Sequence, residues 1–117
     1  MGFSPHVYLR HILDEADFLV HQGRGLPREQ FVGDATRTRA FAWSLEVIGA
    51  MCKEVPEPFR MSHPEVRWQR WAETADRLIV HYFAVDYDVV WDLVTSAVPD
   101  LRRQIGMILA ESPEEFS

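Results

Sequence analysis

Apolar residues recur at helical spacing along most of the chain, in segments separated by glycine and proline. The pattern predicts a first helix over residues 5–23, with Ser4 as its N-cap and Pro5 in its first turn. The inward positions of this helix are Tyr8, Ile12, Leu13, Ala16, Leu19 and Val20. A short helix that starts at Pro27 is expected to end at Gly33.

A long third helix is expected after Asp34, which suits the N-cap position. One apolar stripe of this helix carries Phe41, Leu45, Ile48, Cys52 and Val55. Ala42 and Gly49 are small, so another helix can approach closely there. Pro56 and Pro58 are expected to end this helix, and His63-Pro64 marks a loop.

Three further helices complete the expected architecture. The fourth runs over about residues 66–83, the fifth follows an N-cap at Asp86, and the sixth begins at Pro99. Their apolar positions include Val89, Val90, Leu93, Val94, Ala97, Leu101, Ile105, Ile108 and Leu109. Sustained alternation at period two is absent from the sequence. We therefore predict an all-α, up-down bundle of five to six helices, forming one domain over residues 1–117 with a polar tail from about residue 111.

Composition narrows the class of function. The net charge of −6 argues against a large non-specific nucleic-acid surface but leaves a local basic cleft open. Cys52 is the only cysteine, so an internal disulfide is excluded and a reducing compartment is the simple interpretation. The sequence has neither a signal-peptide pattern nor an apolar run long enough to span a bilayer, so we expect a soluble, cytoplasmic protein.

Histidines and tryptophans were weighed as binding groups. His6 and His11 are five residues apart and fall on different helix faces, and His21 adds no recognised ligand spacing, so no metal site and no cofactor are expected. The four tryptophans are more typical of a core or a dimer interface than of base stacking. They are Trp43, Trp68, Trp71 and Trp91.

The densest group of reactive side chains lies in the stretch from residue 75 to 86. Asp76, Arg77, His81 and Tyr82 fall there within two helical turns. Histidine titrates near neutrality and can move a proton, whereas arginine stays charged and binds phosphate oxygens as a fork. This stretch is therefore the first candidate for a functional site.

The order and spacing of several short segments resemble the HepT-like members of the HEPN superfamily, from Tyr8 to Leu109. The segments are residues 45–50 (Leu-Glu-Val-Ile-Gly-Ala), residues 63–66 with Trp68, residues 77–79, residues 82–83, residues 85–86, residues 90–91 and residues 99–101. This resemblance implies an α-helical homodimer encoded beside a nucleotidyltransferase antitoxin of the MNT type. It also implies a metal-independent ribonuclease, whose partner silences it by attaching AMP to a tyrosine.

The catalytic motif of that family is an arginine, a polar residue, three further residues and a histidine, with the tyrosine two positions later. Aligned on the flanking segments, the arginine falls on Ala75 and the histidine on Val80, while Asp76 and Tyr82 match the polar residue and the tyrosine. Two positions of the third helix at which relatives often carry Arg and Glu are Trp43 and Ala50. The resemblance therefore implies a ribonuclease site that has lost polar groups at four positions.

A helical wheel tests whether the displaced side chains can substitute. At about 100° per residue, Arg77 and His81 fall on the side of Arg70 and Glu73, whereas Val80 falls beside Asp76. His81 would need a one-residue bulge in the helix to face the side on which the resemblance implies a catalytic cleft. Three hypotheses stay open: a HepT-like toxin component with a degenerate site, an active ribonuclease using Asp76, Arg77 and His81 in a shifted geometry, and a helical module that binds a nucleotide or a protein. Tyr82 is the candidate AMP acceptor in the toxin–antitoxin setting, and the alternative is a tyrosine packed on the helix with its hydroxyl at the rim.

Overall fold

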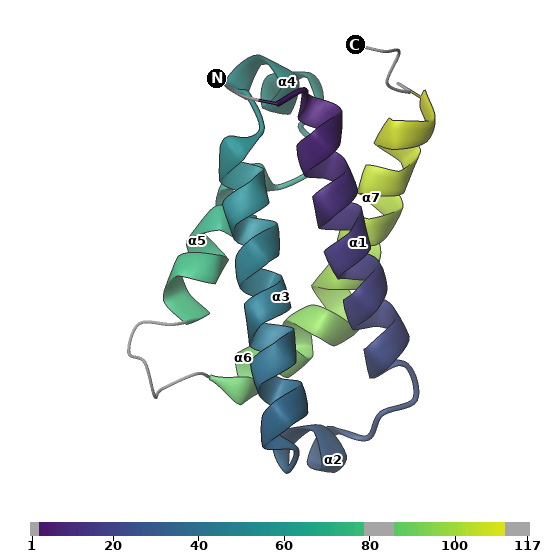
Figure 1. The fold of residues 1–117 in the computed structure, drawn as a ribbon, viewed down its shortest axis with the longest axis vertical. Helices are drawn as coiled ribbons and strands as arrows, with labels where there is room; N and C mark the ends of the chain where they lie inside the picture. Colours follow the sequence, from purple (N-terminus) through teal and green to yellow (C-terminus); the bar gives the residue numbers. More distant parts are fainter. Residues whose placement is uncertain (1–2, 79–85, 112–117) are drawn as a thin grey trace.

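Three long helices form the frame of the molecule: α1 (Pro5–Gly23), α3 (Ala35–Glu54) and α7 (Val98–Glu111). The computed structural model describes residues 3–78 and 86–111, and within these ranges every regular element is a helix, which confirms the all-α prediction. Helix α1 packs against both α3 and α7 (Figure 1). None of the described helices is long and apolar enough to cross a membrane.

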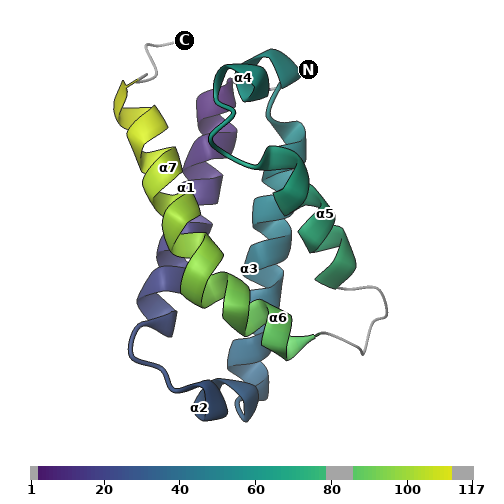
Figure 2. The same cartoon turned by 180° about the vertical axis from the view of Figure 1, so that it is seen from behind.

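The shorter helices close the two ends and one side of this frame. Helix α2 (Arg28–Val32) lies at one end and α4 (Glu57–Ser62) lies at the other, beside the N-terminus (Figure 1). Helix α5 (Trp68–Leu78) packs against α3, its main neighbour. Seen from behind, α6 (Tyr87–Asp92) continues through a π-helical segment, η1 (Leu93–Ala97), into α7 (Figure 2).

The predicted N-caps of α1 and α3 are confirmed. The hydroxyl of Ser4 accepts a hydrogen bond from the backbone N–H of His6 at 3.2 Å, and Pro5 occupies the first turn of α1. The carboxylate of Asp34 accepts from the backbone N–H of Arg37 at 3.0 Å. Each cap satisfies a donor that the helix itself leaves free, so these two helices begin where the sequence predicts.

One hydrophobic core joins the inward faces of all the long helices. Its fully buried side chains include Leu9, Ile12, Leu19, Phe31, Phe41, Leu45, Ile48, Val90, Leu101, Ile105 and Ile108. Most of these residues lie on the stripes that the helical periodicity predicts. Phe31 of the short helix α2 packs against Phe41 of α3, with ring centroids 5.2 Å apart. This contact ties helix α2, at one end of the frame, to the core.

The region after α3 needs one correction, because a helix that the sequence pattern does not predict lies before the expected loop at His63-Pro64. Helix α4 starts directly after Pro56 and carries Pro58 in its first turn. Proline lacks an N–H and has a fixed φ, and neither property is a disadvantage in the first turn, where the N–H has no acceptor within the helix. The prolines therefore end α3 and begin α4. The loop is confined to the residues around His63, whose carbonyl accepts a hydrogen bond from the indole N–H of Trp68 at 3.0 Å.

A second correction concerns the predicted fifth and sixth helices, which form one continuous helical run. Pro99 cannot donate to the carbonyl of Thr95, and its ring would collide with that carbonyl in a regular α-helix. The chain widens here instead, and the backbone N–H of Val98 bonds to the carbonyl of Leu93, five residues earlier. Proline thus produces a π-helical segment and a bend rather than a break.

Candidate functional site

The candidate motif lies at the end of α5, of which residues 75–78 are described. Ala75 and Leu78 are buried, at 7% and 2% exposure, while Asp76 and Arg77 are exposed. This division follows from helical geometry, because residues three apart share a face. Val80, His81 and Tyr82 lie outside the described residues, so their predicted roles stay predictions.

Ala75 is buried in a close contact between α5 and α3. A Cβ atom built on Gly49 would lie 2.2 Å from the Cβ of Ala75 and 2.9 Å from the carbonyl oxygen of Trp71. Any side chain larger than hydrogen at Gly49 would therefore force the two helices apart. The expectation that Gly49 allows a second helix to approach closely is confirmed, and the partner surface is the face of α5 that carries Ala75.

Asp76 points away from this contact and pairs with a residue that the sequence reasoning missed. The Nζ of Lys53, near the end of α3, lies 2.9 Å from Oδ1 of Asp76. Both side chains are exposed, so the pair contributes less than about 1 kcal/mol to stability. Its consequence is electrostatic, since the ammonium group neutralises the carboxylate locally. Only the packing register of α3 on α5, which the sequence does not fix, identifies Lys53 as the partner.

Two further positions singled out from the sequence lie on the same side of α3 as Lys53. Trp43 is 66% exposed and Ala50 is exposed, and spacings of seven and three residues place them with Lys53 on one helix face. We call the surface formed by Trp43, Ala50, Lys53 and Asp76 the α3–α5 edge. Trp68 and Trp71 are buried, as expected of core tryptophans, whereas Trp43 faces solvent in the single chain.

Arg70, Glu73 and Arg77 occupy an exposed face of α5. The predicted polar stripe is confirmed for these three residues, and its fourth member, His81, falls outside the described part. Glu73 accepts a hydrogen bond from the side-chain amide of Gln69 at 3.1 Å. Arg77 projects from α5 about 100° around the helix axis from Asp76.

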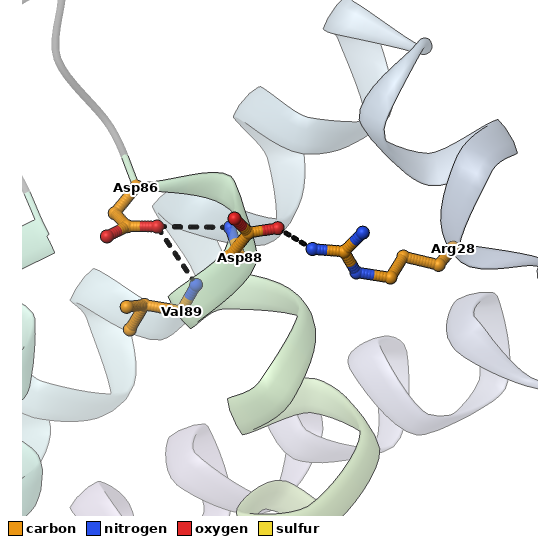
Figure 3. A network of polar contacts seen from close by, with 4 residues as sticks. All are labelled: Arg28, Asp86, Asp88 and Val89. Carbon is orange, nitrogen blue, oxygen red and sulfur yellow. Dashed lines mark hydrogen bonds and ion pairs between the residues drawn. The ribbon is translucent and has the colours of Figure 1, made fainter.

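Asp86 is the N-cap of α6, the helix that follows the motif segment in the sequence. One carboxylate oxygen accepts hydrogen bonds from the backbone N–H groups of Asp88 and Val89, at 3.1 and 3.2 Å, and so caps α6 as predicted (Figure 3). Asp88 also forms an ion pair with Arg28 of α2 (Figure 3). The start of α6 is therefore held by a helix cap and by a contact between α6 and α2.

Cys52 does not belong to a reactive centre. The side chain is completely buried on α3, and burial raises the pKa of the thiol to about 12, with Arg60 acting weakly in the opposite direction. A thiol of this kind stays protonated and is a poor nucleophile. In the described ranges, three or more His, Cys, Asp or Glu side chains do not gather at any point in a geometry that would hold a metal ion.

A comparison with known protein families covers the same helical frame. The family described as "Ribonuclease HepT-like" matches residues 8–108. The chain belongs to the HepT-like family. The match spans nearly all the described helices, from α1 to α7, so the family assignment concerns the fold as a whole and not one motif.

Individual relatives extend over the same length. The HepT-like chain is 42% identical, over 91% of its length and 95% of the relative's, to a provisionally named RNase of Caldanaerobacter subterraneus subsp. tengcongensis. It is 34% identical, over 87% of its length and 93% of the relative's, to the "Probable ribonuclease HepT" of Thermococcus cleftensis. A provisionally named RNase of Methanocaldococcus jannaschii is 33% identical over 89% of the chain and 86% of the relative. No solved structure matches the chain.

Proposed function

We propose that this chain is the toxin-side component of a HepT-like toxin–antitoxin pair whose ribonuclease site is degenerate, and that its retained role is to bind RNA or a nucleotidyltransferase partner. One observation carries the proposal. The position at which the family resemblance implies the catalytic arginine is Ala75, a methyl group buried against Gly49. A methyl group can neither bind phosphate nor stabilise the charge that develops during phosphodiester cleavage.

The surroundings of Ala75 support the same conclusion. Asp76 is held by Lys53 at 2.9 Å, so the polar residue of the motif is engaged in an ion pair rather than presented to a substrate. Trp43 and Ala50 leave the α3–α5 edge without the arginine and the glutamate that relatives often carry there. Lys53 is the only cation among the residues that define this edge.

An RNA-cleavage assay tests the degenerate site directly. We expect the full-length protein to leave a labelled single-stranded RNA uncut at the rate of the buffer control, and the double substitution Ala75→Arg with Val80→His to introduce cleavage. Replacing both groups restores the cation and the proton-transfer residue together. Circular dichroism would verify that the double variant folds. Cleavage by the wild type that disappears in His81→Ala would contradict the proposal.

That contradicting result would favour the alternative, an active ribonuclease with a shifted site. The exposure of Arg77 favours this alternative, because its guanidinium is open to solvent and available to phosphate. Arg77→Ala and His81→Ala would then each reduce cleavage, whereas Asp76→Asn would have a smaller effect. A nucleotide-binding helical module is the third alternative, and titration with labelled nucleotides would detect it.

The partner assignments of the proposal follow from family membership. We infer a homodimer in which the two α3–α5 edges face a common cleft, and an MNT-type nucleotidyltransferase that recognises the dimer and attaches AMP to Tyr82. Co-expression with a neighbouring nucleotidyltransferase, followed by intact-mass measurement, would show a mass increase of one AMP group. Tyr82→Phe is the matched control, since it removes only the acceptor hydroxyl.

A further inference from the structure

Two cavities flank the beginning of α5, the helix labelled beside α3 in Figure 2. The α7-side cavity has a volume of about 480 Å³ and lies between α5 and the run formed by η1 and α7. The α4-side cavity, of about 400 Å³, lies between α4 and α5. Each volume is in the range of pockets that bind small organic molecules.

Arg67 and Arg70 line both cavities, so their side chains form the ridge between them. Neither arginine forms an ion pair within residues 3–78 and 86–111. Two carboxylates also line the α7-side cavity: Glu65 lies 3.5 Å from the imidazole of His63, and Asp100 lies 3.6 Å from the guanidinium of Arg103. Neither carboxylate forms a salt bridge with Arg67 or Arg70, so both guanidinium groups of the ridge can bind a phosphate.

The backbone adds to this positive potential. The ridge lies at the N-terminus of α5, an 11-residue helix, whose first-turn N–H groups have no acceptor within the helix. The aligned peptide dipoles place a partial positive charge at the same end. Two guanidinium groups and a helix N-terminus at one place favour a phosphate group.

The α7-side cavity has the lining that a nucleoside requires. Trp71, Leu93 and Leu101 give it apolar walls, and Thr74 supplies a hydroxyl group. The side-chain amide of Gln104 donates to the carbonyl of Glu65 at 3.0 Å, which ties α7 to the loop before α5 at one end of the cavity. Apolar and polar side chains contribute about equally to the lining, and a nucleoside likewise combines a largely apolar base with a hydroxyl-bearing sugar.

The π-helical segment is part of the same cavity. Leu93, Ser96 and Ala97, three of the five residues of η1, line it. A π-helical insertion displaces the side chains that follow it and occurs frequently at functional sites. Ser96 and Ala97 thus share the wall of the cavity with Arg70, Trp71 and Thr74 of α5.

We propose that single-stranded RNA binds across the first turns of α5, with one phosphodiester group held by Arg67 and Arg70 and the two adjoining nucleosides in the flanking cavities. This site rests on the RNA-binding part of the proposed function. Around the axis of α5, Arg67 lies about 180° and Arg70 about 120° from Asp76, so the ridge is separate from the α3–α5 edge. In a dinucleotide the phosphate lies between two nucleosides, as the ridge lies between the two cavities. A mononucleotide would occupy only one of the cavities.

Fluorescence anisotropy with 5′-fluorescein-labelled hexauridylate tests the site in the full-length dimer or monomer as purified. We expect Arg67→Ala with Arg70→Ala to weaken binding by about tenfold or more and to reduce the slope of log affinity against log salt by about 0.7, the value for one phosphate of a single strand. Arg24→Ala with Arg102→Ala, which removes the same charge elsewhere on the surface, should weaken binding by less than about threefold. Arg67→Lys with Arg70→Lys should bind more tightly than the double-alanine variant, because the charge remains, but more weakly than the wild type, because the guanidinium fork is lost.

The outcomes separate the site from the proposed function. Equal loss in the two double-alanine variants would overturn the site while leaving RNA binding intact. Wild-type binding that neither variant changes would do the same, and it would point to the α3–α5 edge. Unlabelled UpU should compete better than UMP, and equal competition would overturn the two-cavity arrangement. A wild type that does not bind hexauridylate would reject both the site and the RNA-binding part of the proposed function.

Discussion

The thiol of Cys52 shows how burial alone determines the chemistry of a single residue. It lies on the apolar stripe of α3 and is completely buried, and the loss of hydration raises its pKa to about 12. In the unfolded chain the same thiol titrates near its ordinary value of 9.0. The native state therefore holds the proton more tightly than the unfolded state does.

This difference predicts an alkaline loss of stability. The contribution of Cys52 is fully present below about pH 9 and is lost as the pH rises toward 12, by roughly 1 kcal/mol per pH unit. Urea unfolding between pH 8.5 and 10.5 should show a steeper fall in the free energy of unfolding for the wild type than for Cys52→Ala. Other groups titrate in both proteins, so the difference between the two slopes isolates the thiol. Parallel slopes would contradict the prediction.

At the same scale, the sequence predicts exposure better than it predicts partners. The wheel of α5 correctly places Arg70, Glu73 and Arg77 on an exposed face, because helical periodicity fixes direction within one element. It does not identify Lys53 as the partner of Asp76, since that contact depends on the packing register between two helices and on a long, flexible side chain. The positions of His81 and Tyr82 remain predictions.

At the scale of elements, the contact between α3 and α5 is set by Gly49 and Ala75. A methyl group on Gly49 would lie 2.2 Å from the Cβ of Ala75, well inside van der Waals contact. Gly49→Ala should therefore destabilise the fold by about 1–3 kcal/mol through overpacking, although alanine favours the helix by about 1 kcal/mol. Thermal unfolding followed by circular dichroism measures the net effect.

The double variant Gly49→Ala with Ala75→Gly is the control for that clash. Removing the Cβ of Ala75 relieves the shortest contact but leaves the carbonyl of Trp71 at 2.9 Å, so partial recovery of the lost stability is expected. Gly106, at which an added Cβ has no neighbour within 4 Å, provides a second comparison. Gly106→Ala should be neutral or stabilising. Equal loss at Gly49 and Gly106 would show that the close approach is not the cause.

The boundaries of the elements show where sequence patterns stop being informative. The caps at Ser4, Asp34 and Asp86 depend only on residues two or three positions away in the sequence, and their helices begin where the sequence predicts. Proline is ambiguous, because it can end one helix, begin another or bend a continuous one. Pro58 begins α4, and Pro99 lies within a helical run that widens into η1. The sequence alone does not distinguish these outcomes, since each depends on the packing of the neighbouring turn.

For the whole molecule, the order of helices and most of the core are readable from the sequence, whereas the surface left for assembly is not. Periodicity assigns Leu45 and Ile48 to the core, and both are buried. It does not reveal that Trp43, on the same helix, is 66% exposed in the single chain. A tryptophan in this position has a large apolar surface that a second subunit can cover, and tryptophan is enriched among the residues that dominate binding energy at interfaces.

The proposed homodimer therefore predicts a specific effect of one substitution. Trp43→Glu should weaken dimerisation by about 30-fold or more, because it removes the apolar contact and places a charge in the interface. Sedimentation equilibrium of the full chain measures the dissociation constant. Met61, which is 74% exposed on α4, provides the matched control, and Met61→Glu should leave the dimer unchanged. A Trp43→Glu variant that dimerises like the wild type would place the interface away from the α3–α5 edge, and a monomeric wild type would reject the dimer itself.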